Sequence, residues 1–439
     1  MKYLMLLIAL SFCKISFGQF VSSFHEDQLL YDHNIVMESE FLVRKSEQPK
    51  RLTWVLPNFS ATMISPQLTY GDIYVEESKT LDLTLATQSG DDFDLQMNAR
   101  VSYGGLSYRI NNIRFSLFHD AIVDTRMNIP NHLFELVTEG NSRLVSGDID
   151  INPQVLFSST HKWALGFDYQ KENLVLGVQA NMYTGNAFLN TYNSTLNIDF
   201  GENFFEFGFD KDILVESSGA INFNTIDSVD LILKENALTT LGSFSNIGFG
   251  LSAQFSYTFN DNLRIFGRVD DIGIIRWTNE TQILDEQSSE SFGGFDIRES
   301  YISGQTFSIE DTLYSKLDIA HSSASFTSTL QNSFFIGANY IINDYFSAGI
   351  LLRSKNNGVN QVFFLEPYIT LSPFEKTSIT VANFMQKSSP INPKLTLRTE
   401  LGETFGINLS LVNPWRVSRY YDTKMIHASL GMYLRFLKE

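Results

Sequence analysis

The chain has little cysteine, little charge and no long apolar run, and each shortage excludes a class of protein. Its one cysteine is Cys13, near the N-terminus, so the remainder can form no disulfide and offers no thiol chemistry. Charged residues make up 18% of the chain, below the roughly 25% of soluble globular proteins. No segment approaches about 18 consecutive apolar residues, so we expect no transmembrane helix.

Basic residues and catalytic motifs are scarce as well. The 32 Lys and Arg residues stand against 49 Asp and Glu, and the formal net charge of −17 disfavours a nucleic-acid partner. No His-Glu-x-x-His, phosphate-binding glycine loop, Gly-x-Ser-x-Gly or Cys-x-x-Cys is found, and the seven histidines are scattered without the spacing of metal ligands. We therefore predict no enzyme, no metal and no cofactor.

The N-terminus predicts export. Lys2 supplies a positive start, an apolar run over residues 4–12 follows, and small residues precede a cleavage point between Gly18 and Gln19, so residues 1–18 read as a signal peptide. Lipidation of Cys13 is the alternative, which the bulky Phe12 disfavours. Residues 19–51 lack long alternation and form either a plug for a lumen or a periplasmic leader.

The most frequent pattern in the chain is the alternation of apolar and polar residues. Aromatic residues make up 13% of it, and apolar side chains recur at every second position over repeated stretches. The clearest run is Ile247–Phe259, whose other face carries only Gly, Ser, Gln and Thr. A second run, Phe93–Tyr103, has the roughly 9 to 11 residues that a tilted strand needs to cross an outer membrane. Such faces suit lipid on one side and a polar lumen on the other.

The links between these runs differ in length. Short polar links, such as residues 342–345, predict tight periplasmic hairpins. The polar stretch over residues 278–331 predicts an extracellular loop. Residues 129–141 break the pattern with Pro130, apolar side chains three and four apart, and Gly140, which predict a short lumenal or loop helix near 130–139.

The stretch Met425–Phe436 ends the alternation with one wholly apolar face. Its pattern is similar to the C-terminal assembly signal of outer-membrane barrels, carried here by Ser429, Gly431, Leu434 and Phe436. We therefore predict an all-β fold, a transmembrane antiparallel β-barrel over residues 52–436 with about 14 strands, within a range of about 12 to 16.

Several stretches together carry a family resemblance. The 129–141 segment, Lys162–Tyr169, Leu174–Ala180 and Val269–Trp277 resemble a family of Bacteroidetes outer-membrane barrels classed as a domain of unknown function. The resemblance implies a barrel distantly similar to the fatty-acid-transporter type, a group that includes the PorV-like accessory barrels of type IX secretion. It implies no catalytic residues.

One charged cluster stands out inside an alternating run. We predict a lumenal polar cluster on the segment after Leu263, and two interpretations remain open: a constriction or ligand site, or interstrand ion pairs that hold a narrow barrel shut. Gly273 predicts a bulge or close approach that shifts the alternation before Trp277. The predicted cluster consists of Arg264, Arg268, Asp270, Asp271 and Arg276.

These features predict a protein of the Gram-negative outer membrane. We expect it to pass a small hydrophobic solute or to serve as an accessory in surface export. Its partners would be outer-membrane lipid, the barrel-assembly machinery and, in the accessory role, type IX secretion components. The alternative is a soluble, secreted β-rich adhesin or carbohydrate-binding protein.

Overall fold

A computed structural model describes most of the chain after Arg51. The described residues are 52–65, 74–75, 80–81, 92–132, 148–150, 152–191, 194–200, 206–219, 222–225, 228–230, 246–260, 262–293, 321–356, 361–374, 377–385, 391–402, 404–414 and 425–436. The predicted signal peptide, its cleavage point and the 19–51 segment lie outside them. Of the predicted helix near 130–139, only Pro130 to His132 are described, and Asn131 and His132 are helical.

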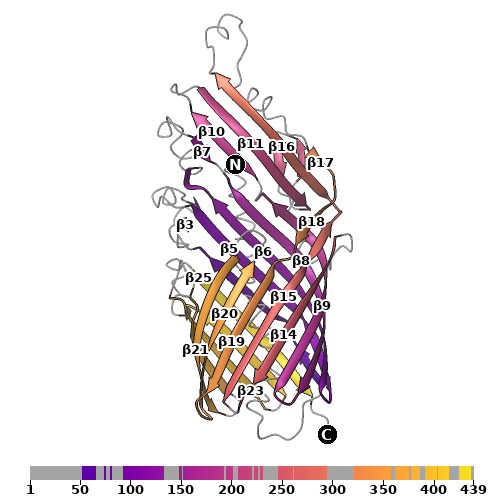
Figure 1. The fold of residues 1–439 in the computed structure, drawn as a ribbon, viewed down its shortest axis with the longest axis vertical. Coiled ribbons are helices and arrows are strands. Elements are labelled where there is room, and N and C mark those ends of the chain that lie inside the picture. Colours follow the sequence, from indigo (N-terminus) through magenta and orange to yellow (C-terminus); the bar gives the residue numbers. More distant parts are fainter. Residues whose placement is uncertain are drawn as a thin grey trace, which may run out of the picture.

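The described residues form a closed antiparallel barrel of fourteen strands, which confirms the predicted fold (Figure 1). Two of the fourteen are interrupted, β1 with β2 and β18 with β19. The strands are β1 Leu52–Val55 with β2 Asn58–Ile64, β5 Phe93–Ile110, β6 Ile113–Ile129, β8 Gln154–Lys171, β9 Leu174–Asn190, β14 Ile247–Thr258, β15 Leu263–Trp277, β18 Phe326–Thr329 with β19 Asn332–Ile341, β20 Phe346–Asn356, β21 Gln361–Phe374, β22 Thr377–Asn383, β23 Pro393–Leu401, β24 Phe405–Val412 and β25 Met425–Phe436.

The last strand closes the barrel. β25 pairs with β1 from Leu52 opposite Phe436, and with β2 as far as Ile64 opposite Met425. On its other side β25 pairs with β24. The backbone groups of the first and last strands therefore bond to each other, as a membrane-spanning sheet requires.

Alternation along β14 shows how the sequence selects the two faces of the wall. Phe249 and Leu251 are about two-thirds exposed on the outer face, whereas Gly248, Gly250 and Ser252 lie on the inner face. The apolar row from Ile247 to Tyr257 covers ten residue steps of about 3.3 Å, which a tilt of about 40° reduces to a height of about 25 Å. That height matches the apolar band of outer-membrane barrels.

The wall continues above this band. β9 pairs with β14 up to Thr184, and beyond that point with β11 Glu206–Ser218. β11 pairs along its whole length with β16 Thr281–Gly293 (Figure 1). The shorter strands β7 Asp148–Asp150, β10 Thr195–Phe200 and β17 His321–Ser322 join the same sheet, and two pairs stand apart from it, β3 Tyr74–Val75 with β4 Thr80–Leu81 and β12 Asn222–Thr225 with β13 Ser228–Asp230.

This extension corrects the loop predicted over residues 278–331, because β16, β17 and β18 all fall within it. The prediction was wrong because the β16 sequence has polar residues at successive positions, as in Ser288–Ser291, and no alternation. A strand outside the apolar band needs no apolar outer face, so the alternation that reveals the other wall strands is missing there.

Short turns close the opposite end of the barrel. The β8–β9 link is Glu172–Asn173. The β19–β20 link is residues 342–345, as predicted from its polar residues. Glu172 adopts a φ of 49°, within the left-handed region that tight hairpin turns require. Among the described residues, no helix has the length and apolarity to cross a bilayer.

Candidate functional site

The upper lumen encloses a cavity of about 560 Å³. Its lining comes from strands on several sides of the barrel, including β2, β5, β6, β8, β9, β15, β18, β20 and β21. One side of the lining is mainly apolar and another is charged, so the cavity has an amphipathic wall.

The apolar side is a cluster of buried rings and aliphatic side chains. Phe188 stacks against Trp277 with ring centroids 5.0 Å apart and planes at 30°. Trp277 is fully buried, and its Nε1 donates to Ser328 Oγ at 2.8 Å. Gly185 makes room for this indole, because a Cβ there would lie 2.2 Å from the ring. Leu156, Tyr183, Ile275, Phe326 and Leu330 complete the cluster.

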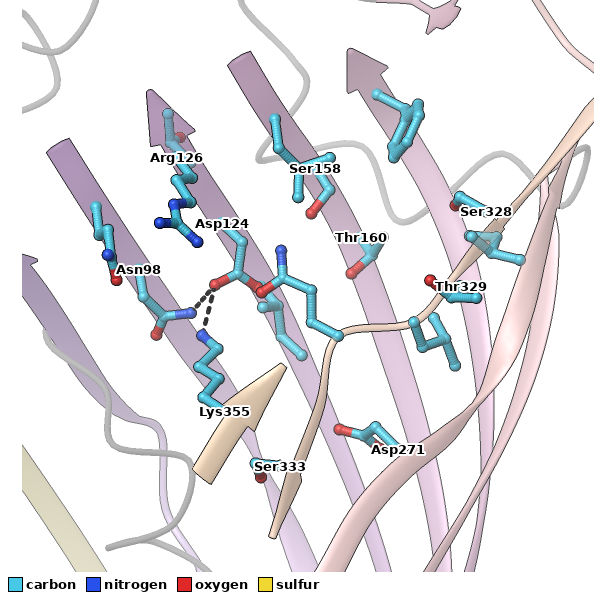
Figure 2. A pocket seen from close by; sticks show the side chains of 18 of the residues that line it. Asn98, Asp124, Arg126, Ser158, Thr160, Asp271, Ser328, Thr329, Ser333 and Lys355 are labelled. Carbon is cyan, nitrogen blue, oxygen red and sulfur yellow. Dashed lines mark hydrogen bonds and ion pairs between the residues drawn. The ribbon is translucent and has the colours of Figure 1, made fainter. Parts of the chain in front are cut away.

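The charged side centres on Asp124 of β6 (Figure 2). Its carboxylate accepts a hydrogen bond from Asn98 Nδ2, and Lys355 Nζ lies 3.1 Å from Oδ1. The side-chain amide of Gln331, in its hydrogen-bonding orientation, donates to both carboxylate oxygens at 3.2 Å.

Lys355 and Asp124 come from opposite walls. Lys355 lies on β20, six strand spacings from β6 through β8, β9, β14, β15 and β19, in a barrel of fourteen strands. Six spacings are nearly half the circumference, so this ion pair crosses the lumen. We call Asp124, Lys355 and Gln331 the cross-lumen bridge.

Below the cavity, toward the short turns, buried ion pairs fill the lumen. Lys162 Nζ lies 2.7 Å from one oxygen of Asp271 and 3.0 Å from the other, and Asn181 Nδ2 donates to the same carboxylate at 2.7 Å. Lys162 is fully buried, so each of its charge-assisted bonds replaces water that has been excluded.

The neighbouring pairs are equally enclosed. Arg268 Nε bonds to Asp270, while its Nη1 and Nη2 donate to Gln254 and Gln179 at 2.9 Å each. The set made by Lys162–Asp271, Arg268–Asp270, Arg114–Asp168 and the Arg353–Glu366–Lys394 trio is called the charged floor.

The predicted polar cluster divides between the two faces of β15. Arg268, Asp270 and Asp271 lie in the charged floor, and Arg264 Nε donates inward to Ser256 Oγ at 2.8 Å. Arg276 does not join them, because it is exposed on the outer face, on the same side of the strand as Ile272 and Ile274.

A bulge explains that division. The register between β14 and β15 shifts opposite Ser252, where Asp271 takes a φ of 59° and the inward parity changes. Gly273 supplies the close approach, since a Cβ there would lie 2.0 Å from the carbonyl oxygen of Phe249. Asp270 and Asp271 thus both face inward, and Arg276 is turned outward.

Sequence reasoning missed most of the other buried charges. Asp124 and Arg126 of β6, and Lys162 of β8, sit within long strands at the parity opposite to exposed residues such as Leu117 and Leu165. The same rule that selected Arg268 would therefore have selected them. The cross-lumen bridge had no such signal, since its partners are 231 residues apart.

The residues of the predicted assembly signal all lie on β25. Ser429 pairs with Ser60 and Ser410, Gly431 with Asn408, and Leu434 with Trp54 and Phe405. Phe436 is 42% exposed at the end of the strand, opposite Leu52. Recognition of this segment by the assembly machinery stays a prediction.

Comparisons with solved structures give distant likenesses. The toluene transporter TodX of P. putida is 8% identical, with 90% of this chain and 92% of that chain covered and a TM-score of 0.41. The translocator domain of the autotransporter NalP from Neisseria meningitidis is 8% identical, with 94% and 96% covered and a TM-score of 0.34. The toluene transporter TbuX of Ralstonia pickettii is 9% identical, with 88% and 89% covered and a TM-score of 0.31. None of these likenesses carries an argument about a solute.

Sequence comparison is more specific. No curated protein matches the chain at a significant level. A family model matches residues 47–404, which covers most of the chain and nearly all of the barrel. The chain therefore belongs to the family of unknown function DUF5723.

Proposed function

We propose that this protein is a non-enzymatic barrel of the Gram-negative outer membrane that passes a small solute with an apolar part. The lumenal cavity of about 560 Å³, with its stacked Phe188 and Trp277, is the observation that carries the proposal. Ligand sites are commonly concave and mostly apolar, with a few convergent polar groups that fix orientation.

The outer face supports the membrane location. Leu165, Val178, Leu251 and Ile272 are each at least 59% exposed, and they come from four strands that neighbour one another in the wall. A continuous apolar face of this kind is unfavourable in water and favourable in lipid. The secreted adhesin, the alternative weighed on sequence, would require this face to be covered.

The charged floor makes the barrel a gated path and not an open pore. Lys162, Arg268, Asp270 and Arg353 have side chains no more than 4% exposed in the lumen below the cavity. We therefore expect a low ion conductance together with measurable uptake of a solute that binds in the cavity.

Reconstitution tests the proposal. The full chain in planar bilayers should show little conductance, and proteoliposomes should take up a small neutral arene such as toluene faster than protein-free vesicles. Trp277→Ala should reduce this uptake several-fold, because it removes the largest ring of the cavity. Trp54→Ala is the matched control, since Trp54 is 46% exposed on the outer face. Equal uptake by wild type and empty vesicles would refute the transport role.

The accessory role in surface export rests on a different observation. β11 and β16 pair over thirteen residues beyond the lipid band and so present protein where a secreted partner would dock. Affinity purification from membranes distinguishes the two roles. Stable co-purification of type IX secretion components supports the accessory role, and its absence together with solute uptake supports transport.

A further inference from the structure

Arg126 is a buried arginine of the cavity wall whose hydrogen-bonding capacity is largely unused. Its side chain is 9% exposed, and it lines the cavity from β6 (Figure 2). Its nearest acidic contact is Asp94, with Nη2 and Oδ2 3.6 Å apart, beyond normal hydrogen-bond length. Within the described part of the chain, Nε and Nη1 have no partner.

Other arginines in the lumen differ from Arg126 in how closely their guanidinium nitrogens are paired. Arg114 places Nε 2.8 Å and Nη2 2.6 Å from one oxygen of Asp168. All three nitrogens of Arg268 donate hydrogen bonds. Arg100 also lines the cavity with Nε and Nη1 unpartnered, but its Nη2 forms a close ion pair with Asp120. Three arginines line the cavity, Arg100, Arg126 and Arg353, and the acidic partner of Arg353 lies at 3.2 Å. Arg126 therefore has the loosest acidic partner of the three.

An unsatisfied guanidinium edge selects for a particular ligand group. Nε and Nη1 are donors only, and a carboxylate is the group whose two acceptors suit the guanidinium fork. A buried donor left without a partner is unfavourable, so a ligand that supplies the acceptor gains affinity from it.

The strand register fixes how far this edge lies from the apolar side. Arg126 is opposite Leu156 of β8, which is opposite Asn190 of β9, and Phe188 lies two positions along β9 on the same face. Two strand spacings of about 4.8 Å and two residue steps of about 3.3 Å place the Cα atoms of Arg126 and Phe188 about 12 Å apart. A ligand that reaches both sides therefore has its acid group and its apolar group joined directly or by a short arm.

The apolar group facing this wall is best matched by a ring. Phe188 and Trp277 line the cavity with ring centroids 5.0 Å apart, and a further ring can stack or pack by its edge against them. Phe326 contacts Trp277, with centroids 6.3 Å apart, but does not line the cavity. We infer that the cavity binds a small aromatic carboxylate, with its ring against Phe188 and Trp277 and its carboxylate on Arg126. This assignment rests on the proposed function and names the chemical class of its solute.

Three organic probes of similar size and one small anion separate the alternatives: benzoate, its neutral counterpart benzyl alcohol, the aliphatic acid hexanoate, and inorganic phosphate. Binding is measured by calorimetry on the full chain in lipid nanodiscs. We expect benzoate to bind most tightly. Benzyl alcohol binding as well as benzoate would overturn the role of the acid, and hexanoate or phosphate binding as tightly would overturn the role of the ring.

The variants locate the acid group. Arg126→Gln should weaken benzoate about tenfold or more, equivalent to about 1.4 kcal/mol, and leave benzyl alcohol unchanged. Arg126→Lys should recover part of the loss because it restores the charge. Arg276→Gln, on the exposed outer face, is the matched control. Unchanged benzoate binding by a folded Arg126→Gln barrel, judged by its heat-dependent gel shift, would overturn the inference.

Uptake by proteoliposomes keeps the two proposals apart. If the wild type takes up none of the organic probes, the transport function fails irrespective of what binds. If it takes up benzyl alcohol or hexanoate in preference to benzoate, transport stands and the aromatic carboxylate assignment fails.

Discussion

Removal of one charge from the charged floor should destabilise the barrel far more than removal of both. In Lys162→Met the side chain keeps its length and loses its ammonium, while Asp271 keeps its charge. That carboxylate would retain the Asn181 bond at 2.7 Å and lose Lys162 contacts at 2.7 and 3.0 Å. Lys162 is fully buried, so water does not take its place without rearrangement.

The magnitude follows from that burial. Breaking a buried ion pair by removing one partner costs about 3 to 5 kcal/mol, and converting both partners to neutral groups is often nearly neutral. We therefore expect Lys162→Met to lower the free energy of unfolding by about 3 to 5 kcal/mol. In the double variant Lys162→Met with Asp271→Asn, most of this loss should be recovered.

Asn is the appropriate replacement at position 271 for a backbone reason. Asp271 has a φ of 59°, and Asn tolerates this left-handed region better than an apolar side chain does. Its amide oxygen can still accept the Asn181 bond, and the double variant leaves no unpaired charge at this ion pair.

Denaturant titration in lipid vesicles, followed by tryptophan fluorescence, measures these differences. Lys171→Met is the matched control, because Lys171 is exposed at the β8–β9 turn and should change stability by no more than about 0.5 kcal/mol. If Lys162→Met unfolded at the wild-type denaturant concentration, or if the double variant were no more stable than the single one, the assigned role of this pair would be refuted.

Three further changes test the wall. Leu251→Arg, at a position 65% exposed in the apolar band, should lower the free energy of unfolding in vesicles by about 2 to 4 kcal/mol. Tyr345→Arg at the short turn should lower it by about 1 kcal/mol or less, and equal losses would contradict the membrane position. Gly273→Ala should lower the folded fraction on unheated gels because its Cβ would meet a backbone oxygen, whereas Gly402→Asn should be tolerated in open space at a φ of 69°. Phe436→Ala should slow assembly in cells more than it lowers the stability of the purified barrel, and an unchanged assembly rate would remove Phe436 from the signal.

The fold was largely predictable because a barrel wall with an apolar outer face and a polar inner face requires alternation along each strand. Phe249 and Leu251 lie on the exposed outer face, so their neighbours Gly248, Gly250 and Ser252 face inward, and this alternation can be recognised directly in the sequence. β16 shows the limit of the rule. It lies beyond the apolar outer band, and its sequence carries no apolar row that would have identified the strand.

The site was predictable in part for the same reason. Inward parity selected Arg268 and Asp270, but it could not place Arg276, because the bulge at Asp271 reverses the parity within the strand. A left-handed Asp leaves only a weak signal in the sequence, since Asn and Asp are merely enriched in that region. Which charges meet across the lumen depends on the closure of the barrel and has no local signal at all.

The ion pairs of the lumen differ in how far apart their two partners lie around the barrel. Arg114 and Asp168 are direct register partners on β6 and β8, so their pair lies along the wall and does not block the lumen. Lys162 and Asp271 are three strand spacings apart, and their contact bridges part of the lumen.

Asp124 and Lys355 are joined across nearly half the circumference, and Gln331 reaches the same carboxylate from the break between β18 and β19. Lys355 is also the most exposed cation among the ion pairs described, at 30%. Its side chain therefore loses the least buried surface when it moves away from Asp124. In the proposed transport role, we therefore expect the cross-lumen bridge to open by side-chain motion alone, without a break in the hydrogen-bonded wall. We expect the charged floor beneath it, with its fully buried Lys162, to be the slower barrier.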